Sequence, residues 1–145
     1  MSRAAAILLL VPALVACSAP RTADPAPASG LEVRGIELGR AIGPDKAVTA
    51  PAGAFAPSDT VYTSVVTEGK AKTATLAARW TYQGALLEET EQRIAPSGTV
   101  ISEFHVFNPA GWSPGEYRVE ILLDGRAVGD RTFRVDPASW PAERP

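Results

Sequence analysis

Short segments in which apolar and polar residues alternate follow one another along the chain from Leu31 to Asp136. A period of two places alternate side chains on opposite faces of a β-strand. Glycine, proline and aspartate separate these segments roughly every 8–12 residues, which is typical of all-β domains. We find no segment with the apolar stripe of an amphipathic helix. The pattern therefore predicts an all-β fold over residues 31–136.

The pattern predicts about seven strands. They are Leu31–Leu38, Thr60–Thr67, Thr73–Tyr82, Leu86–Arg93, Val100–Phe107, Glu116–Leu123 and Arg126–Asp136. A long segment rich in alanine, proline and glycine, Gly39–Asp59, joins the first two strands. We expect a short irregular edge segment within it near Ala47–Thr49, and we expect Phe55 to plug the edge of the fold.

Turn residues specify how some of these strands are joined. Asp124-Gly125 lies between two alternating segments and predicts a two-residue type I′ hairpin, because both turn residues must adopt positive φ. Gln83-Gly84 predicts a looser turn between the third and fourth strands. Pro96-Ser97-Gly98 separates the fourth strand from the fifth.

The alternation also predicts which side chains face the core. The expected inward residues are Val61, Val65, Leu76, Ala78, Trp80, Phe104, Val106, Tyr117, Val119, Ile121, Phe133 and Val135. Two strands leave the choice open, since Tyr62 and Val66 compete with Val61 and Val65, and Ile101 and Phe107 compete with Phe104 and Val106. A register slip of one residue would exchange the two faces.

The first 17 residues have the pattern of an export signal. Arg3 precedes an apolar stretch of 13 residues, Ala4–Ala16, which is too short to span a membrane. It is the length of the apolar region of a secretory signal peptide. Leu14-Val15-Ala16-Cys17 resembles the lipobox of bacterial lipoproteins. The alternative is an ordinary signal peptide followed by a cysteine that occurs there by chance.

The lipobox resemblance implies cleavage after residue 16 and diacylglyceryl transfer to Cys17. Two or more acyl chains would hold the protein stably at a membrane. In Gram-negative members of that family an aspartate after the cysteine favours the inner membrane, so Ser18 points to the periplasmic face of the outer membrane. Residues 17–30 predict a tether rich in alanine, proline and serine, and residues 137–145, with Trp140, predict a flexible C-terminal tail.

Composition narrows the possible functions. The chain has 145 residues with one cysteine, one histidine and a net charge of −2. A single cysteine excludes an intramolecular disulfide bond and a multi-cysteine metal site. The small net charge gives no electrostatic basis for binding nucleic acid. We therefore expect no cofactor and no nucleic-acid partner.

The predicted strands resemble the immunoglobulin-like and fibronectin type III-like modules of bacterial surface proteins. Such modules have a buried tryptophan on the third strand and a tyrosine near the start of the sixth, and here these are Trp80 and Tyr117. The segment Pro114–Val119 and the Asp124-Gly125 hairpin before Phe133 complete the resemblance. It implies an antiparallel β-sandwich with Trp80, Tyr117 and Phe133 in its core. The inter-sheet cysteine pair of antibody domains is missing.

The residues that carry chemistry do not form a recognisable catalytic motif. His105 lies two residues after Glu103, and a base paired with this carboxylate is conceivable, but we expect a histidine that faces solvent or an interface. The acidic run Glu88–Glu91 lacks the cleft that a glycosidase needs. We interpret the run as a charged edge strand that resists edge-to-edge pairing.

The turn-rich segment Asn108–Gly115 joins the fifth and sixth strands and contains Trp112. Trp112 would either bind a partner from a rigid loop or cap the open end of the sandwich. With Phe107 and His105 it forms our set of candidate partner-binding residues. We expect a non-catalytic binding, adaptor or structural module of the cell envelope. The alternatives are an enzyme inhibitor that acts through residues 108–115 and a small enzyme that uses His105 and Glu103, and the oligomeric state stays open.

Overall fold

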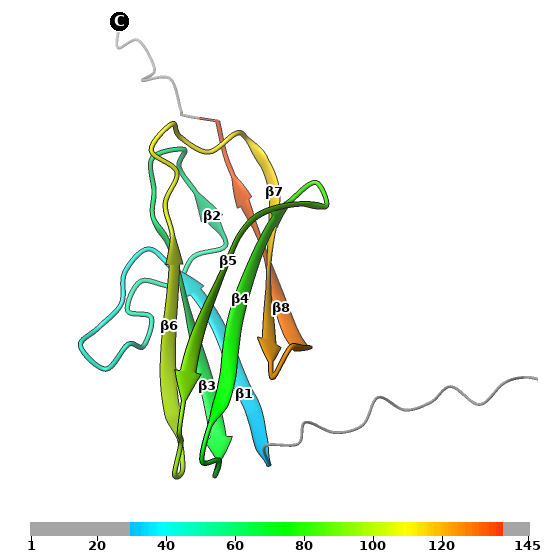
Figure 1. Ribbon diagram of the computed structural model, residues 1–145. Coiled ribbons are helices and arrows are strands. Elements are labelled where there is room, and N and C mark those ends of the chain that lie inside the picture. Colours follow the sequence, from blue (N-terminus) through cyan, green and yellow to red (C-terminus); the bar gives the residue numbers. More distant parts are fainter. Residues whose placement is uncertain (1–29, 138–145) are drawn as a thin grey trace, which may run out of the picture.

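The computed structural model describes residues 30–137, which form two packed β-sheets (Figure 1). The predicted signal peptide, Cys17 and the tail residues 138–145 lie outside the described residues. Between residues 30 and 137 there is no helix long and apolar enough to cross a membrane. The all-β prediction is confirmed.

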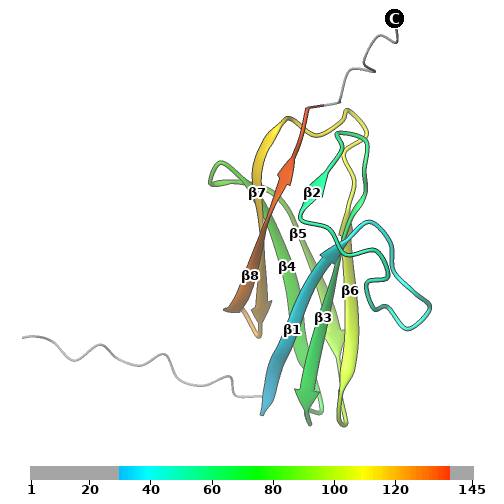
Figure 2. The ribbon, with the colours of Figure 1, turned by 180° about the vertical axis from the view of Figure 1, so that it is seen from behind.

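The smaller sheet has three strands and the larger has five. The order in the smaller sheet is β1 (Leu31–Gly39), β3 (Val61–Gly69) and β6 (Val100–Val106) (Figure 2). The order in the larger sheet is β2 (Ala54–Phe55), β8 (Arg126–Val135), β7 (Gly115–Leu123), β4 (Ala74–Tyr82) and β5 (Ala85–Ile94). All neighbours are antiparallel except β2 and β8. Seven strands match the predicted segments within two residues, and β2 is additional.

The segment between β1 and β3 is ordered by its own hydrogen bonds. Residues 39–51 form a hairpin, in which the backbone N–H of Arg40 donates to the carbonyl of Ala50 at 2.9 Å. The short irregular segment expected near Ala47–Thr49 belongs to this hairpin, where it makes one isolated bridge, between Ile42 and Val48, and forms none of the named strands.

The short strand of this segment lies further along, at β2. The ring of Phe55 is 1 % exposed and packs edge-on against Phe133 at 5.4 Å between ring centroids. Burial of this side chain draws its backbone against β8, so the prediction that Phe55 plugs the edge is confirmed.

Two hairpins have the same tight turn. Asp124 and Gly125 have φ of 51° and 79°, which confirms the predicted turn with two positive φ values. Gln83 and Gly84 have φ of 49° and 81°, so the prediction of a looser turn there is wrong. Tyr82 pairs directly with Ala85. A two-residue connection between antiparallel strands favours a type I′ turn, because the twist of this turn matches the twist of the strands.

The core lies between the sheets and follows the predicted alternation. All twelve side chains expected to face inward are 4 % exposed or less: Val61, Val65, Leu76, Ala78, Trp80, Phe104, Val106, Tyr117, Val119, Ile121, Phe133 and Val135. The competing register is excluded, because Tyr62, Val66 and Ile101 are half-buried and Phe107 is 53 % exposed. Core packing thus selects one of the two faces that the sequence left open.

The two long edges of the sandwich differ. At one edge β1 packs against β8, and a Cβ placed on Gly129 would lie 2.7 Å from Cδ1 of Ile36. At the other edge β5 and β6 each end a sheet (Figure 1). There the amide Nε2 of Gln92 donates to the carbonyl oxygen of Glu103 at 2.5 Å. This side-chain hydrogen bond joins the edge strands of the two sheets.

Candidate functional site

Two tyrosines fix the loop between β6 and β7. The rings of Tyr82 and Tyr117 stack with 4.4 Å between their centroids. The Tyr117 hydroxyl donates to the carbonyl of Ser113 at 2.8 Å, and the Tyr82 hydroxyl donates to the carbonyl of Pro114 at 3.1 Å. The first of these bonds is the tyrosine corner of immunoglobulin-type sandwiches. Burial raises the pKa of the Tyr117 phenol, and the nearby Tyr82 adds to this rise.

Trp112 closes this end of the core. Its side chain is 6 % exposed and packs edge-on against Tyr117, with 5.4 Å between ring centroids. The indole N–H donates to the carbonyl of Asp59 at 2.8 Å, and the backbone N–H donates to the carbonyl of Pro57 at 2.8 Å. Trp112 therefore occupies the capping position, one of the two that the sequence left open, and it is not an exposed side chain on a loop.

The residues before Trp112 form a braced turn. The side chain of Asn108 accepts a hydrogen bond from the backbone N–H of Ala110 at 3.0 Å and donates to the carbonyl of Gly111 at 2.7 Å. Gly111 has a φ of 85°, which favours glycine. These bonds hold the loop in one conformation, as its proline and glycine content suggests.

Three large apolar side chains are exposed at this same end. Leu86 is 59 % exposed, Leu87 is 47 % exposed and Phe107 is 53 % exposed. Phe107 is one of the candidate partner-binding residues predicted from the sequence, whereas neither leucine was predicted to be one. The signal was present, since two consecutive leucines at the start of a strand cannot both face inward. A register shift between β4 and β5 at Trp80 and Thr81 adds one residue to the β5 strand there.

A pocket lies between the start of β5 and the end of β6. Its lining residues are Leu87, Glu88, Val106, Phe107, Asn108 and Trp112. The volume is about 180 Å³. An apolar cavity of about 150 Å³ holds a benzene molecule, so one large apolar side chain fits. Trp112 and Val106 are buried beneath it, and Leu87 and Phe107 are exposed beside it.

His105 and Glu103 lie on the outer face of the smaller sheet. The imidazole Nδ1 is 2.6 Å from Oε1 of Glu103. The Tyr62 ring on the neighbouring strand lies 5.6 Å from the imidazole, between centroids. His105 is 59 % exposed, so water screens the pair. The structure thus brings the two predicted residues together on an open surface, two residues before Phe107.

The acidic run lies on β5, which is an edge strand as predicted. Glu89 on the outer face pairs with Arg79 at 2.7 Å, and Arg79 reaches Glu120 at 3.3 Å. Hydrogen bonding to Glu89 raises the pKa of Arg79. These carboxylates therefore belong to a surface network of ion pairs. No group of three or more histidine, cysteine, aspartate or glutamate side chains within residues 30–137 is placed to hold a metal ion.

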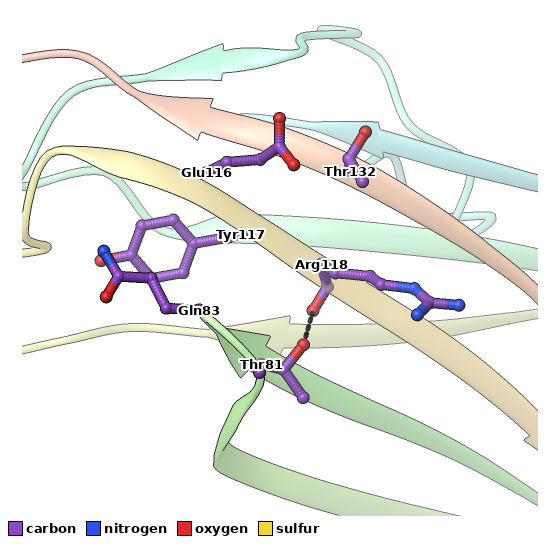
Figure 3. Close-up of a pocket in the computed structure, with 7 residues that line it drawn as sticks. Thr81, Gln83, Glu116, Tyr117, Arg118 and Thr132 are labelled. Carbon is purple, nitrogen blue, oxygen red and sulfur yellow. Dashed lines mark hydrogen bonds between the residues drawn. The ribbon is translucent and has the colours of Figure 1, made fainter.

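A second hollow lies on the outer face of the larger sheet (Figure 3). Thr81, Glu116, Arg118 and Thr132 line it, and the Thr81 hydroxyl donates to the carbonyl of Arg118 at 3.5 Å. The Arg118 guanidinium forms an ion pair with Asp130 at 3.1 Å. Since this cation already has a carboxylate partner, the hollow has no free charge with which to select an anion.

Comparison with known proteins supports the fold. No protein-family model and no curated protein match the chain. Among solved structures, an immunoglobulin-like protein from Pseudomonas aeruginosa is 14 % identical, with a TM-score of 0.52 over 73 % of this chain and 96 % of that one. A β-glucosidase variant from Listeria innocua, in complex with laminaribiose, is 10 % identical, with a TM-score of 0.50 over 75 % of this chain and 16 % of that one.

Because the match covers only 16 % of the β-glucosidase chain, the likeness is to one part of that enzyme. An alkylpurine DNA glycosylase from Pseudomonas fluorescens also matches, at 12 % identity and a TM-score of 0.49, over 74 % of this chain and 30 % of that one. Likeness at these identities concerns fold and not activity. The structure and the first match agree with the predicted fold, and the chain is an all-β protein with an immunoglobulin-like sandwich.

Proposed function

We propose that this protein is an exported lipoprotein whose immunoglobulin-like domain binds a protein partner in the cell envelope without catalysis. The observation that carries the proposal is the pocket between β5 and β6, beside which Leu87 and Phe107 are exposed. In this proposal the partner inserts one large apolar side chain into the pocket. Its backbone lies along the open edge formed by the two strands.

The composition of the pocket favours a protein partner. An exposed aromatic side chain such as Phe107 beside a cavity is typical of the centre of protein interfaces. Glu88 and Asn108 supply polar groups at the pocket, and such groups fix the orientation of an inserted residue. His105, which is 59 % exposed, lies on the strand that leads to Phe107 and supplies a polar rim.

Two adjacent leucines provide a matched test of this proposal. Leu87 lines the pocket, whereas Leu86 does not line it although it is more exposed. We expect Leu87→Ser to reduce capture of the partner from solubilised envelope by about tenfold or more, because loss of a central interface residue costs more than about 1.4 kcal/mol. Leu86→Ser should capture it as the natural chain does. Equal capture by all three proteins contradicts the proposed surface.

The proposed anchoring depends on the Leu14–Cys17 motif and has its own test. Cells grown with labelled palmitate should incorporate the label into this protein and not into the Cys17→Ala variant. Absence of label, or label that survives the substitution, contradicts the lipoprotein assignment. Ser18 after the cysteine favours the periplasmic face of the outer membrane in a Gram-negative cell.

A second candidate function is enzyme inhibition by the 108–115 loop. The hydrogen bonds of Asn108 to Ala110 and Gly111 hold this loop rigid, and a rigid exposed loop loses little entropy when it enters an active-site cleft. Ala110→Asp would then abolish inhibition of envelope hydrolases and leave capture through Leu87 unchanged. Hydrolysis of a substrate panel that is lost in His105→Ala would instead show an enzyme.

A further inference from the structure

Two loops lie side by side at the end of the sandwich opposite the pocket (Figure 1). One loop joins β3 to β4 and the other joins β5 to β6. Gly69 and Gly98 exchange backbone hydrogen bonds at 3.2 and 2.9 Å, and the N–H of Ala71 donates to the carbonyl of Pro96 at 3.1 Å. These bonds connect the two loops, each of which crosses from one sheet to the other, so their backbones keep fixed positions relative to each other.

Two lysines project from this surface. Lys70 and Lys72 are exposed and line an open depression of about 420 Å³ together with residues 71 and 95–97. Neither lysine has an ion-pair partner among the described carboxylates. The chain has one other lysine, Lys46, which lies in the 39–51 hairpin.

Acidic groups also lie near this end. Glu68 accepts a hydrogen bond from Arg34 at 2.8 Å. Asp124 accepts one from the backbone N–H of Thr75 at 2.9 Å. The residues that line the depression include Lys70 and Lys72 and no acidic side chain, so the positive charge is confined to the two loops, although the whole chain is slightly acidic.

The polypeptide from Cys17 reaches the domain at this same surface. β1 begins at Leu31, and the preceding Gly30 lies against the β3–β4 loop, since a Cβ on Gly69 would overlap the carbonyl oxygen of Gly30. Thirteen residues separate Cys17 from Leu31, and a chain of that length spans about 45 Å at most. A lipid on Cys17 is thus joined to the domain at its lysine-bearing end.

We propose that Lys70 and Lys72 dock this end of the domain on anionic phospholipid headgroups of the membrane in which Cys17 is anchored. The inference rests on the anchoring in the proposed function. Lysines near an anionic membrane surface each strengthen association about fivefold, and two strengthen it about 30-fold. Docking by this end directs the pocket beside Leu87 and Phe107 away from the membrane, toward a partner.

The test uses the lipidated chain in vesicles. Because the sulfur of Cys17 is blocked by the lipid and the chain has no other cysteine, Ser97→Cys introduces one reactive thiol beside Lys70, in the same depression. Ala110→Cys places the same thiol at the opposite end. Each protein carries a fluorophore on this thiol, and a quencher is attached to lipid headgroups. The vesicles are phosphatidylcholine with or without one third phosphatidylglycerol.

We expect strong quenching at position 97 and weak quenching at position 110 when phosphatidylglycerol is present. Lys70→Gln with Lys72→Gln should remove most of this difference, as should high salt, whereas Lys46→Gln should leave it unchanged. Equal quenching at both positions overturns the inference. Loss of the quenching at position 97 when inorganic phosphate is added at matched ionic strength also overturns it, because that result would reveal a site for the free ion.

Failure of the anchoring itself gives a different result. An unlipidated chain would not float with the vesicles at all, and this is measured before the fluorescence is read. A chain that floats with the vesicles but is quenched equally at positions 97 and 110 retains the anchoring and refutes the docking.

Discussion

The tyrosine pair at the capped end makes a quantitative prediction about stability. The Tyr117→Phe substitution removes one hydroxyl, and it keeps the ring that stacks on Tyr82 and lies 5.2 Å from Phe133. The lost bond to Ser113 is 2.8 Å long and its donor is 4 % exposed. A buried neutral hydrogen bond contributes about 1 kcal/mol. Since Ser113 is exposed, water replaces the lost donor, and no larger penalty is expected.

The Tyr82→Phe substitution is the matched control. Tyr82 has the same ring contact but lies nearer solvent, and its bond to Pro114 is longer at 3.1 Å. We expect a loss of about 0.5 kcal/mol or less for this variant. Urea unfolding followed by tryptophan fluorescence measures both losses, and the m-value should stay constant because neither variant changes the exposed area.

The alkaline pH dependence gives a second readout. Burial raises the pKa of Tyr117 above its ordinary value of 10.0. The unfolded chain therefore ionises first, so this stabilisation is complete below about pH 10 and is lost as the pH rises through the folded pKa. Tyr117→Phe should weaken that alkaline loss. An unchanged midpoint for Tyr117→Phe, or a loss in Tyr82→Phe at least as large, would refute the reasoning.

Three further predictions follow from single contacts. Asp59 accepts hydrogen bonds from the backbone N–H of residue 56 and from Arg40, and these lower its pKa from the ordinary 3.8 although partial burial opposes them. In urea unfolding, Asp59→Asn should therefore cost about 1 kcal/mol of stability at about pH 6 and almost nothing near pH 2. A difference that does not change with pH would contradict this. Gly69 has a φ of 127° and contacts the backbone of residue 30, so Gly69→Ala should lower the thermal midpoint by several degrees, while Gly35→Ala, whose Cβ has room, should leave it nearly unchanged. Trp112→Phe should cost about 1–3 kcal/mol in urea unfolding, because it removes a buried hydrogen bond and leaves space in the cap, and a neutral result would exclude the capping role.

The positions of the main strands, and the inward faces of the third, sixth and seventh, were predictable from the sequence, because alternation and turn chemistry are local. Trp80 and Val119 face inward as predicted, and Asp124-Gly125 forms the turn that its two residues favour. The faces of the strands that contain Val61 and Phe104 stayed open until the core packing chose between them. The tyrosine corner was also foreseeable, since Tyr117 lies four residues after the carbonyl that its hydroxyl contacts.

The tertiary structure alone decided the rest, because those features depend on which distant segments come together. Trp112 is a cap because its N–H reaches the carbonyl of Asp59, which lies 53 positions away in the chain. The pocket exists because β5 and β6 belong to different sheets that end at the same edge, which leaves Leu87 beside Phe107. Lys70 likewise lies beside the start of β1 only because β3 runs antiparallel to it. The sequence thus determined which strands form, and the packing of the two sheets decided which side chains meet at each end.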